Sequence, residues 1–264
     1  MRHITLLTDF GTTEGEHTVL KGVIWSILPG AVIADLSHAI DPQNILQAAL
    51  VLERTAFYFP DETIHVVVVD PGVGTERRGI AARFGSQFFV GPDNGVCTPL
   101  LERAEKEKAP VEIVELSNPE YWVHPVSPIF HGRDIFAPAG GHLAAGVPLA
   151  SFGDPVEDVV RLHISEPFLK DGVLFGEVLH IDRFGNLICS PRRKDLEKLG
   201  DGCVYVGEEK IGPIHRTFGE KAVGELVAVY SPSDYLMVAV TNGDACTRLG
   251  VDTGTKVRYI PNRE

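Results

Sequence analysis

The stretch from Val66 to Arg78 constrains the fold of this chain more than any other. It reads Val66-Val67-Val68-Val69-Asp70-Pro71-Gly72-Val73-Gly74-Thr75-Glu76-Arg77-Arg78. Four consecutive β-branched residues predict a strand buried on both faces, and such strands lie inside sheets covered by helices. Pro71 disfavours the helical conformation at Asp70, while Gly72 and Gly74 permit a tight loop. The Asp70 carboxylate is therefore expected at the carboxyl end of the strand, where open α/β sheets bind ligands, with Arg77 close behind it.

Two earlier segments repeat this pattern of an apolar strand that ends in an acid. Residues Ile4–Thr8 precede Asp9, and residues Ala31–Ala34 precede Asp35. Three strands are thus expected to direct three carboxylates toward one edge of a sheet. The alternative for the Asp70 loop is a structural turn whose carboxylate caps a backbone amide. The repetition favours a functional edge.

The segments between these strands carry helical signals. Apolar residues recur at helical spacing from Val19 to Ile27, and Asp41-Pro42 is typical of an N-cap followed by the first residue of a second helix. The order β-α-β-α-β predicts right-handed crossovers and a parallel sheet. Further elements of this part are expected as strands at 79–84 and 87–90 and as helices at 100–108 and 137–146.

The pattern changes after a stretch that contains Pro155, several charges and Pro167. Short strands separated by turns follow, and helical periodicity is scarce, which favours a small β-barrel or sandwich. These strands are expected at 173–181, 187–190, 204–206, 226–230, 235–240 and 256–260. The fold class predicted is α/β, with a Rossmann-like layered domain over residues 1–155, a linker over 156–166 and a small β-barrel over 167–264.

Composition excludes several classes of function. The chain has 264 residues, 44% of them hydrophobic, which suffices for a real core, and its formal charge of −12 disfavours nucleic acid as a partner. Its four cysteines form no C-x-x-C pair, which is typical of reduced cytoplasmic thiols rather than a zinc ribbon. No apolar run approaches ~20 residues and no signal peptide precedes the first strand, so we expect a soluble cytoplasmic protein without membrane contact.

Three features outside the strand ends could carry chemistry. His131 lies between an aromatic residue and a glycine, although a single histidine is more often packed or exposed than catalytic. With Asp9 and Asp70 it could also form a metal site, but the chain has no H-x-H or H-x-x-x-H pair. Asp182 and Asn186 flank a predicted hairpin bend, which is either a simple Asx-type turn or a pair that binds an ammonium and an adenine edge. Phe218 either stacks on a base or plugs the mouth of the barrel.

Taken together, these segments resemble the S-adenosylmethionine hydroxide adenosyltransferase family, relatives of the fluorinating and chlorinating adenosyl enzymes. The resemblance runs nearly end to end and rests on the motifs Thr8-Asp9-Phe10-Gly11, Val69 to Arg78, Pro92-Asp93-Asn94-Gly95, Phe130-His131-Gly132-Arg133-Asp134, His142-Leu143-Ala144-Ala145-Gly146, Asp182 to Asn186 and Ser233 to Val240. Two positions depart from the family pattern: Glu14 stands where Asp is usual, and Asp234 stands where Gly is usual.

The resemblance implies a homotrimer whose active sites lie between the first domain of one subunit and the second domain of a neighbour. The Asp-Arg-His set of the hydrolytic members falls on Asp70, Arg77 and His131, whereas halogenating relatives replace the Asp and the His. Substrate contacts are implied for Asp9 at the ribose hydroxyls, Asn186 and the backbone near Val240 at the adenine, and Asp182 with Ser231 or Ser233 at the methionine end. Phe218 and Asp70 complete the predicted substrate-binding set.

The implied reaction is hydrolysis of S-adenosyl-L-methionine (SAM), the only small molecule required, to adenosine and L-methionine, with no cofactor and no metal. The sulfonium needs no protonation to leave, so the protein chiefly positions a nucleophile in line with the 5′ carbon. Asp70 and Arg77 are expected to orient and stabilise, and His131 to accept the proton. The alternatives are a SAM-dependent halogenase, a metal-dependent hydrolase and a non-catalytic module that binds SAM or adenosine.

Overall fold

The computed structural model describes residues 2–262 and separates the chain into two compact units, the first ending at Leu162 and the second beginning at His163. Each unit is described by itself. The α/β class predicted from the sequence is confirmed: one unit is a layered α/β structure, and the other is a barrel-like antiparallel sheet.

Unit 1 is built on a six-stranded sheet. Its strands are β1 (His3–Thr8), β2 (Val32–Ser37), β3 (Ile64–Val68), β4 (Gly79–Phe84), β5 (Gln87–Pro92) and β6 (Val111–Glu115), in the spatial order β2-β1-β3-β5-β4-β6. The pairs β1–β2, β1–β3 and β3–β5 are parallel, whereas β4 is antiparallel to both of its neighbours. All five residues of β3 are buried, as its unbroken apolar sequence predicts.

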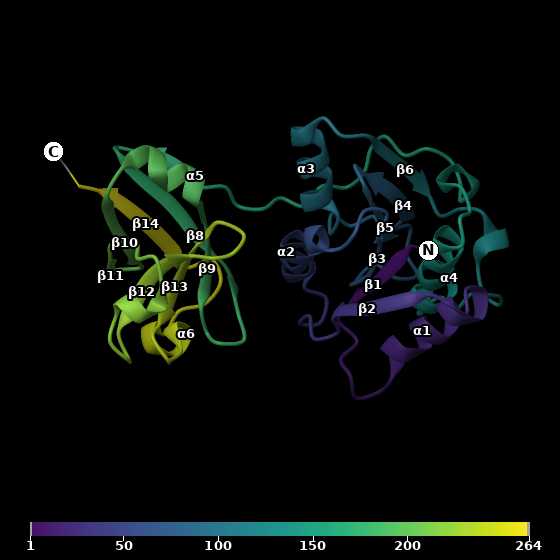
Figure 1. Ribbon diagram of the computed structural model, residues 1–264, viewed down its shortest axis with the longest axis horizontal. Coiled ribbons are helices and arrows are strands. Elements are labelled where there is room, and N and C mark those ends of the chain that lie inside the picture. Colours follow the sequence, from purple (N-terminus) through teal and green to yellow (C-terminus); the bar gives the residue numbers. More distant parts are fainter. Residues whose placement is uncertain (1, 263–264) are drawn as a thin grey trace. The chain divides into compact units, whose positions relative to one another are not determined.

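Helices cover both faces of this sheet (Figure 1). On one face α1 (Glu16–Ile27) and α4 (Ala137–Ala144) pack over Val66 and Val68. On the other, α2 (Ile45–Thr55) and α3 (Thr98–Glu107) pack over Val67 and Val69. Single helical turns lie at η1 (Ala56–Tyr58), η2 (Pro119–Tyr121), the π-helical η3 (Gly132–Phe136) and η4 (Leu149–Ser151). The alternation along β3 therefore feeds two separate apolar cores.

Glycine allows α4 to approach the sheet closely. A Cβ atom at Gly140 would lie 2.6 Å from Cγ2 of Val66, which is closer than two carbon atoms can pack. The small-residue segment from Ala137 onward is therefore a helix packed tightly on β3, as expected.

Two local predictions in unit 1 are wrong. The second helix is capped by Asn44, whose side chain accepts a hydrogen bond from the N–H of Gln47 at 2.9 Å, and not by Asp41. The left-handed conformation of Gln43, with φ of 65°, keeps the chain non-helical up to that point. Asp35 lies inside β2 rather than beyond its end, because pairing with β1 continues through a bulge to Ser37.

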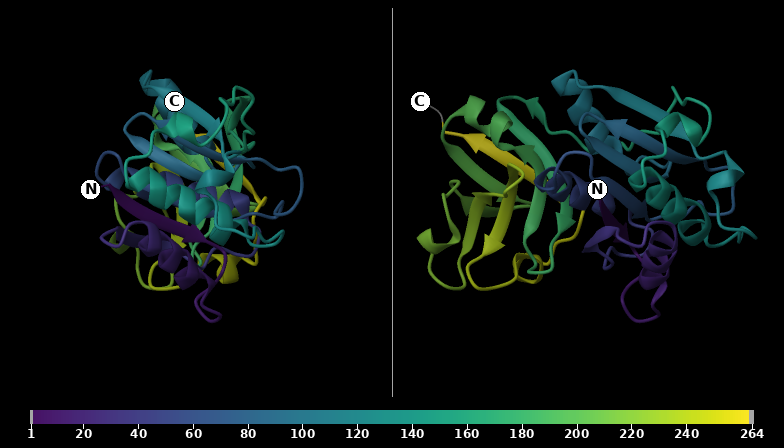
Figure 2. Two further views of the ribbon diagram at one scale, coloured as in Figure 1. Left: turned by 90° about the vertical axis from the view of Figure 1, so that its right-hand side faces the viewer. Right: turned by 45° about the vertical axis from the view of Figure 1, so that its right-hand side comes forward.

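Unit 2 is an antiparallel sheet that curls on itself. Its strands are β7 (Phe168–Lys170), β8 (Val173–Ile181), β9 (Leu187–Arg192), β10 (Gly202–Val206), β11 (Glu209–Gly212), β12 (Leu226–Tyr230), β13 (Tyr235–Val240) and β14 (Lys256–Pro261). The order is β11-β10-β14-β8-β9-β13-β12, with β7 paired to β8. Figure 2 shows the curved sheet in green to yellow. The backbone N–H of His215, three residues after β11, donates to the carbonyl of Ala228 in β12 at 2.7 Å and nearly closes the barrel. Short helical turns are α5 (Arg193–Leu196), η5 (Glu197–Leu199), η6 (Phe218–Glu220) and α6 (Ala245–Leu249).

The first residues of the segment that joins the two sheets pack against the rest of unit 1. The backbone N–H of Val160 donates to Oδ1 of Asp93 at 2.8 Å, and that of Leu162 donates to Oγ1 of Thr98 at 2.8 Å. The predicted linker boundaries of 156–166 stay a prediction. Within residues 2–262, no helix combines the length and apolarity needed to cross a bilayer.

Candidate active site at the carboxyl edge of the parallel sheet

The loop after β3 presents Asp70 in a defined position. The side-chain amide of Asn94 donates to the carbonyl of Val69 at 2.9 Å and so holds the residue just before Asp70. The loop folds back on itself through the hydroxyl of Thr75, which donates to the carbonyl of Gly72 at 2.7 Å. A Cβ atom at Gly72 would lie 3.2 Å from the Cβ of Arg77, so glycine there lets Arg77 return beside the strand end.

Asp70 and Arg77 form a bidentate ion pair. Nε of Arg77 donates to Oδ1 of Asp70 at 3.0 Å, and Nη2 donates to Oδ2 at 2.6 Å. The two side chains are only 5% and 9% exposed, and the guanidinium lies over the ring of Phe136 at 5.3 Å. Parallel hydrogen bonds of this kind fix both partners in one plane. The carboxylate is therefore held in one orientation.

His131 joins this pair from a distant part of the chain. It directly precedes the π-helical turn η3, and its Nδ1 lies 3.2 Å from Nη2 of Arg77. A guanidinium has no lone pair, so Nδ1 must accept this hydrogen bond and the ring proton must sit on Nε2. Burial, and then the charge of Arg77, lower the pKa of His131 below its usual value, against the opposing effect of Asp70 and Asp134. The ring is therefore neutral at pH 7 and offers an N–H through Nε2.

This protonation pattern revises one role expected from the sequence. A proton acceptor needs a free lone pair, and the lone pair of His131 is directed at Arg77. In this arrangement the Nε2–H of the ring can donate to an oxygen atom but cannot take its proton.

Two further contacts bring the loops of Arg77 and His131 together. Gly74 has φ of +77°, and a Cβ atom there would lie 2.4 Å from the carbonyl oxygen of Pro128, so the two loops meet where only glycine fits. The rings of Phe10 and Phe130 meet edge to face with their centroids 5.8 Å apart. Loops that follow β1 and β3 are thereby packed against the segment that carries His131.

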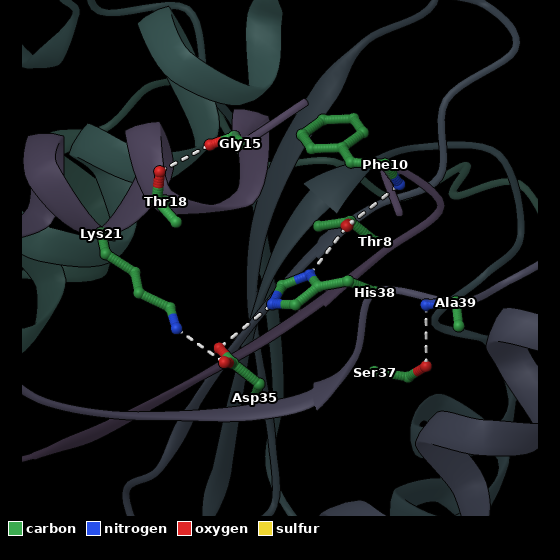
Figure 3. Close-up of polar contacts among 9 residues, drawn as sticks. All are labelled: Thr8, Phe10, Gly15, Thr18, Lys21, Asp35, Ser37, His38 and Ala39. Atoms are coloured by element: carbon green, nitrogen blue, oxygen red, sulfur yellow. Dashed lines mark hydrogen bonds and ion pairs between the residues drawn. The ribbon is translucent and has the colours of Figure 1, made fainter. Parts of the chain in front are cut away.

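Asp9 lies at the same edge of the sheet. It follows β1, which pairs in parallel with β3 so that Thr8 is level with Val68. Oδ2 of Asp9 accepts a hydrogen bond from the backbone N–H of Gln43 at 2.8 Å. Asp9 and Asp70 thus end adjacent strands, whereas Asp35 is bound within β2 by Lys21 and His38 and does not join them (Figure 3).

In unit 2, Asp182 and Asn186 lie side by side in the β8–β9 turn. Oδ1 of Asp182 accepts from the backbone N–H groups of Phe184 and Asn186 at 2.8 and 3.0 Å, and Oδ2 accepts from the side-chain amide of Asn186 at 2.9 Å. The turn is an Asx-type turn, and the carboxylate also fixes the direction of the amide. The amide oxygen of Asn186 and one amide hydrogen are left to bind a ligand edge.

Two other predicted residues lie near this turn. The backbone of Gly185 accepts a hydrogen bond from the N–H of Cys246 at 3.0 Å, which places the β8–β9 turn beside the turn that follows Val240. Phe218 lies at the same end, because its carbonyl accepts a hydrogen bond from the hydroxyl of Thr241 at 2.9 Å. Phe218 as a whole is 42% exposed, so it is not buried in the core of unit 2.

Ser231 and Ser233 lie at the other end of β13. Ser231 precedes the strand, and its Oγ accepts the N–H of Tyr235 at 3.1 Å, whereas Asn186 lies beyond the last paired residues Leu187 and Val238. Five strand steps of ~3.3 Å place the two ends of β13 about 17 Å apart. Within unit 2 the structure therefore groups Asp182 with Asn186, Phe218 and Val240, and it does not group Asp182 with either serine.

Comparison with known proteins identifies the family. Residues 4–153 match the SAM hydroxide adenosyltransferase N-terminal domain, and residues 176–258 match the C-terminal domain of the same family. The chain belongs to the SAM hydroxide adenosyltransferase family.

The relatives of this family member include proteins named as SAM hydrolases and proteins named as fluorinases. The (R)-S-adenosyl-L-methionine hydrolase of Thermus thermophilus is 40% identical over 267 residues, which cover 98% of this chain and 100% of that protein. The fluorinase of an Actinoplanes species is 31% identical over 226 residues, covering 75% of this chain and 74% of the fluorinase. The crystal structure of an uncharacterized conserved protein from Thermotoga maritima has a TM-score of 0.89 at 36% identity and covers 97% of this chain and 99% of that one.

Three residues of this family member that support the site were not singled out from the sequence. Asn94 holds the end of β3, Phe136 packs under the guanidinium, and His38 contacts the end of β1. Asn94 belongs to the Pro92-Asp93-Asn94-Gly95 motif, so the sequence could have indicated its role. The roles of Phe136 and His38 depend on contacts between segments that are distant in the sequence, and only the structure reveals them. Among residues 2–262 no three His, Cys, Asp or Glu side chains are arranged to hold a metal ion.

Proposed function

We propose that this protein hydrolyses SAM to adenosine and L-methionine by in-line attack of water or hydroxide at the 5′ carbon. The observation that carries the proposal is the buried contact of Asp70, Arg77 and His131 in a chain that is 40% identical to a SAM hydrolase. Both a carboxylate–guanidinium pair and a neutral imidazole suit a site that must hold an oxygen nucleophile.

The proposed reaction requires the protein mainly to position the nucleophile and the substrate. The sulfonium departs as the neutral thioether of methionine, so no acid is needed for the leaving group. We assign His131 to hold the attacking oxygen through its Nε2–H, and Asp70 with Arg77 to fix the ring and the local field. The bond from oxygen to the 5′ carbon forms as the carbon–sulfur bond breaks. The extra proton then passes from the new 5′ hydroxyl to solvent water, because a protonated alcohol is a very strong acid.

The substrate contacts are assigned by function. Asp9 binds the ribose hydroxyls and Asn186 binds the adenine edge, with Phe218 stacked on the base and the backbone at Val240 beside it. Asp182 orients the amide of Asn186 at the adenine, and Ser231 or Ser233, at the other end of β13, binds the methionine end. We propose that the two sets combine in a cytoplasmic homotrimer, in which unit 2 of a neighbouring subunit completes each site.

We further propose that the preferred substrate is the R epimer at sulfur, for which the hydrolase relatives are named. The two epimers exchange the directions of the methyl and methionine arms. A site that fixes the adenosine and the amino acid at both ends therefore discriminates by where the methyl group falls.

One chromatographic assay tests the proposal. Each SAM epimer is incubated with the protein, with and without chloride, fluoride and a chelator. We expect adenosine and methionine in every arm, faster from the R epimer, and no 5′-halogenated nucleoside. A halogenated product would favour the function of the fluorinase relatives. Loss of activity with chelator would favour a metal-dependent hydrolase, and bound but intact SAM would favour a non-catalytic module.

A further inference from the structure

We infer that His38, held by Asp35 and Lys21, is a positioning residue that sets the Asp9 carboxylate for binding the ribose hydroxyls. The inference rests on the proposed function of Asp9. It concerns side chains from β1, α1, β2 and the residue after β2, a group that contains none of the proposed catalytic residues.

The side chains form a continuous polar chain (Figure 3). Nζ of Lys21 lies 2.6 Å from Oδ2 of Asp35, and Oδ1 of the same carboxylate lies 3.1 Å from Nε2 of His38, as an ion-pair contact off the line of a straight hydrogen bond. On its other side, Nδ1 of His38 lies 2.9 Å from the hydroxyl of Thr8. The hydroxyl of Thr8 in turn accepts the backbone N–H of Phe10 at 3.3 Å. The chain therefore ends on the two residues that flank Asp9.

The chemistry of the partners fixes the direction of every hydrogen bond. A carboxylate only accepts, so the ring proton of His38 faces Asp35 on Nε2 and Nδ1 is left as an acceptor. The hydroxyl of Thr8 therefore donates to Nδ1, which leaves its oxygen free to accept from Phe10. Burial lowers the pKa of His38 below its usual value despite Asp35, so the ring stays neutral at pH 7. A neutral ring at this position therefore directs its N–H toward Asp35 and accepts from Thr8, whose oxygen accepts from Phe10.

The backbone around Asp9 is held from the same side. The N–H of Gly11 donates to the carbonyl of His38 at 2.7 Å, and the N–H of Gln43 donates to Asp9 itself at 2.8 Å. The segment after β2 thus contacts residues 8, 9, 10 and 11, directly or through Thr8. His38 contacts this segment through its side chain and through its backbone carbonyl. A substitution at this position removes only the side-chain contact.

The polar chain around His38 does more than fill space, because apolar side chains would be enough for packing alone. The side chain of His38 is 4% exposed, Thr8 is fully buried, and the ring of His17 lies on that of His38 with centroids 4.5 Å apart. Burying such groups is costly unless each is bonded, and leucine or valine would fill the same space without that cost. A bonded polar chain instead fixes one rotamer of Thr8 and one path for residues 9 and 10, which is what a ribose-binding carboxylate requires.

Three substitutions of His38 separate its contacts. His38→Ala removes both links, His38→Asn keeps an acceptor near the position of Nδ1, and His38→Gln keeps a donor near the position of Nε2. Ser37→Ala is the matched control, because Ser37 bonds the backbone of Ala39 in the same loop but takes no part in the chain to Thr8. Folding of each variant is checked by the fluorescence of Trp25 and Trp122, both of which lie in unit 1.

The measurements are the dissociation constants of adenosine and 2′,3′-dideoxyadenosine, together with kcat and KM for SAM. We expect His38→Ala to weaken adenosine binding about tenfold, the equivalent of one net hydrogen bond, and to raise KM alike. Dideoxyadenosine, which lacks the ribose hydroxyls, should bind all variants alike. His38→Asn should restore adenosine binding to within about threefold, whereas His38→Gln should not.

Several outcomes overturn the inference. The first is that His38→Ala binds adenosine as tightly as the parent protein. The second is that His38→Ala loses the same affinity for adenosine and for dideoxyadenosine. The third is that Ser37→Ala loses as much adenosine affinity as His38→Ala. If SAM is hydrolysed but these variants bind adenosine as the parent does, only the role of His38 fails. If SAM is not hydrolysed while the adenosine pattern is as expected, the proposed function fails and the positioning role of His38 stands. If the parent binds no adenosine and leaves SAM intact, both fail.

Discussion

The buried Asp70–Arg77 pair makes a prediction in which stability and activity separate. Replacing Asp70 by leucine removes both acceptors of Arg77, at 3.0 and 2.6 Å, and leaves a guanidinium only 9% exposed without its counter-charge. Breaking one side of a buried ion pair costs ~3–5 kcal/mol. The double variant Asp70→Leu/Arg77→Met carries no buried charge, and such apolar replacements are typically neutral to within ~1 kcal/mol or stabilising. Neither variant should hydrolyse SAM.

Urea unfolding followed by tryptophan fluorescence measures this difference. The chain has two tryptophans, Trp25 and Trp122, and both lie in unit 1, so the signal reports unfolding of the unit that carries the pair. With a slope of ~2 kcal/mol/M, Asp70→Leu should lower the midpoint by ~1.5–2.5 M, and the second substitution should restore most of that loss. If Asp70→Leu unfolds at the same urea concentration as the double variant, Asp70 and Arg77 do not form a desolvated ion pair in solution.

Three further predictions concern ionisation and the turn in unit 2. Since burial and the charge of Arg77 lower the pKa of His131 from 6.5, kcat/KM should be flat near pH 7 and fall only below pH 6.5; a fall that begins above pH 7 would contradict a neutral ring. Burial lowers the pKa of His65 from 6.5 to about 4, so its contribution to stability is complete above pH 6.5 and is lost between pH 6.5 and 4, by ~3 kcal/mol in all. His65→Gln should flatten that part of the stability profile in the same fluorescence assay. Asp182→Ala should free the amide of Asn186 and weaken adenosine binding about tenfold, measured by calorimetry, with unit 2 still folded by circular dichroism.

The sequence predicted the architecture well where one strong signal decided it. The apolar run before Asp70 is β3, buried along its length, and the predicted change to short strands corresponds to a change from a parallel-containing sheet to an antiparallel one. It predicted the capping of α2 poorly, because Asp41-Pro42 and Asn44 are both good N-terminal signals and the contact with Gln47 decides between them. The strand β6 was missed, since three of its five residues are exposed or partly exposed and only two face the core.

The site was predictable in composition but not in detail. Asp70 and Arg77 are seven residues apart and their loop is short, so their contact follows from glycine positions in the sequence. The approach of His131, 54 residues further on, depends on the fit of Gly74 against Pro128, which no local pattern encodes. The direction of its ring decides between proton acceptor and donor, and that direction follows only from the position of Arg77.

Labelled water tests the central claim most directly. SAM is incubated with the protein in H₂¹⁸O, and the products are analysed by mass spectrometry. The proposed mechanism predicts one ¹⁸O atom in the 5′ hydroxyl of adenosine and none in methionine. Recovery of the label in homoserine, with 5′-methylthioadenosine as the other product, would place the attack on the methionine side of sulfur and contradict the proposed mechanism.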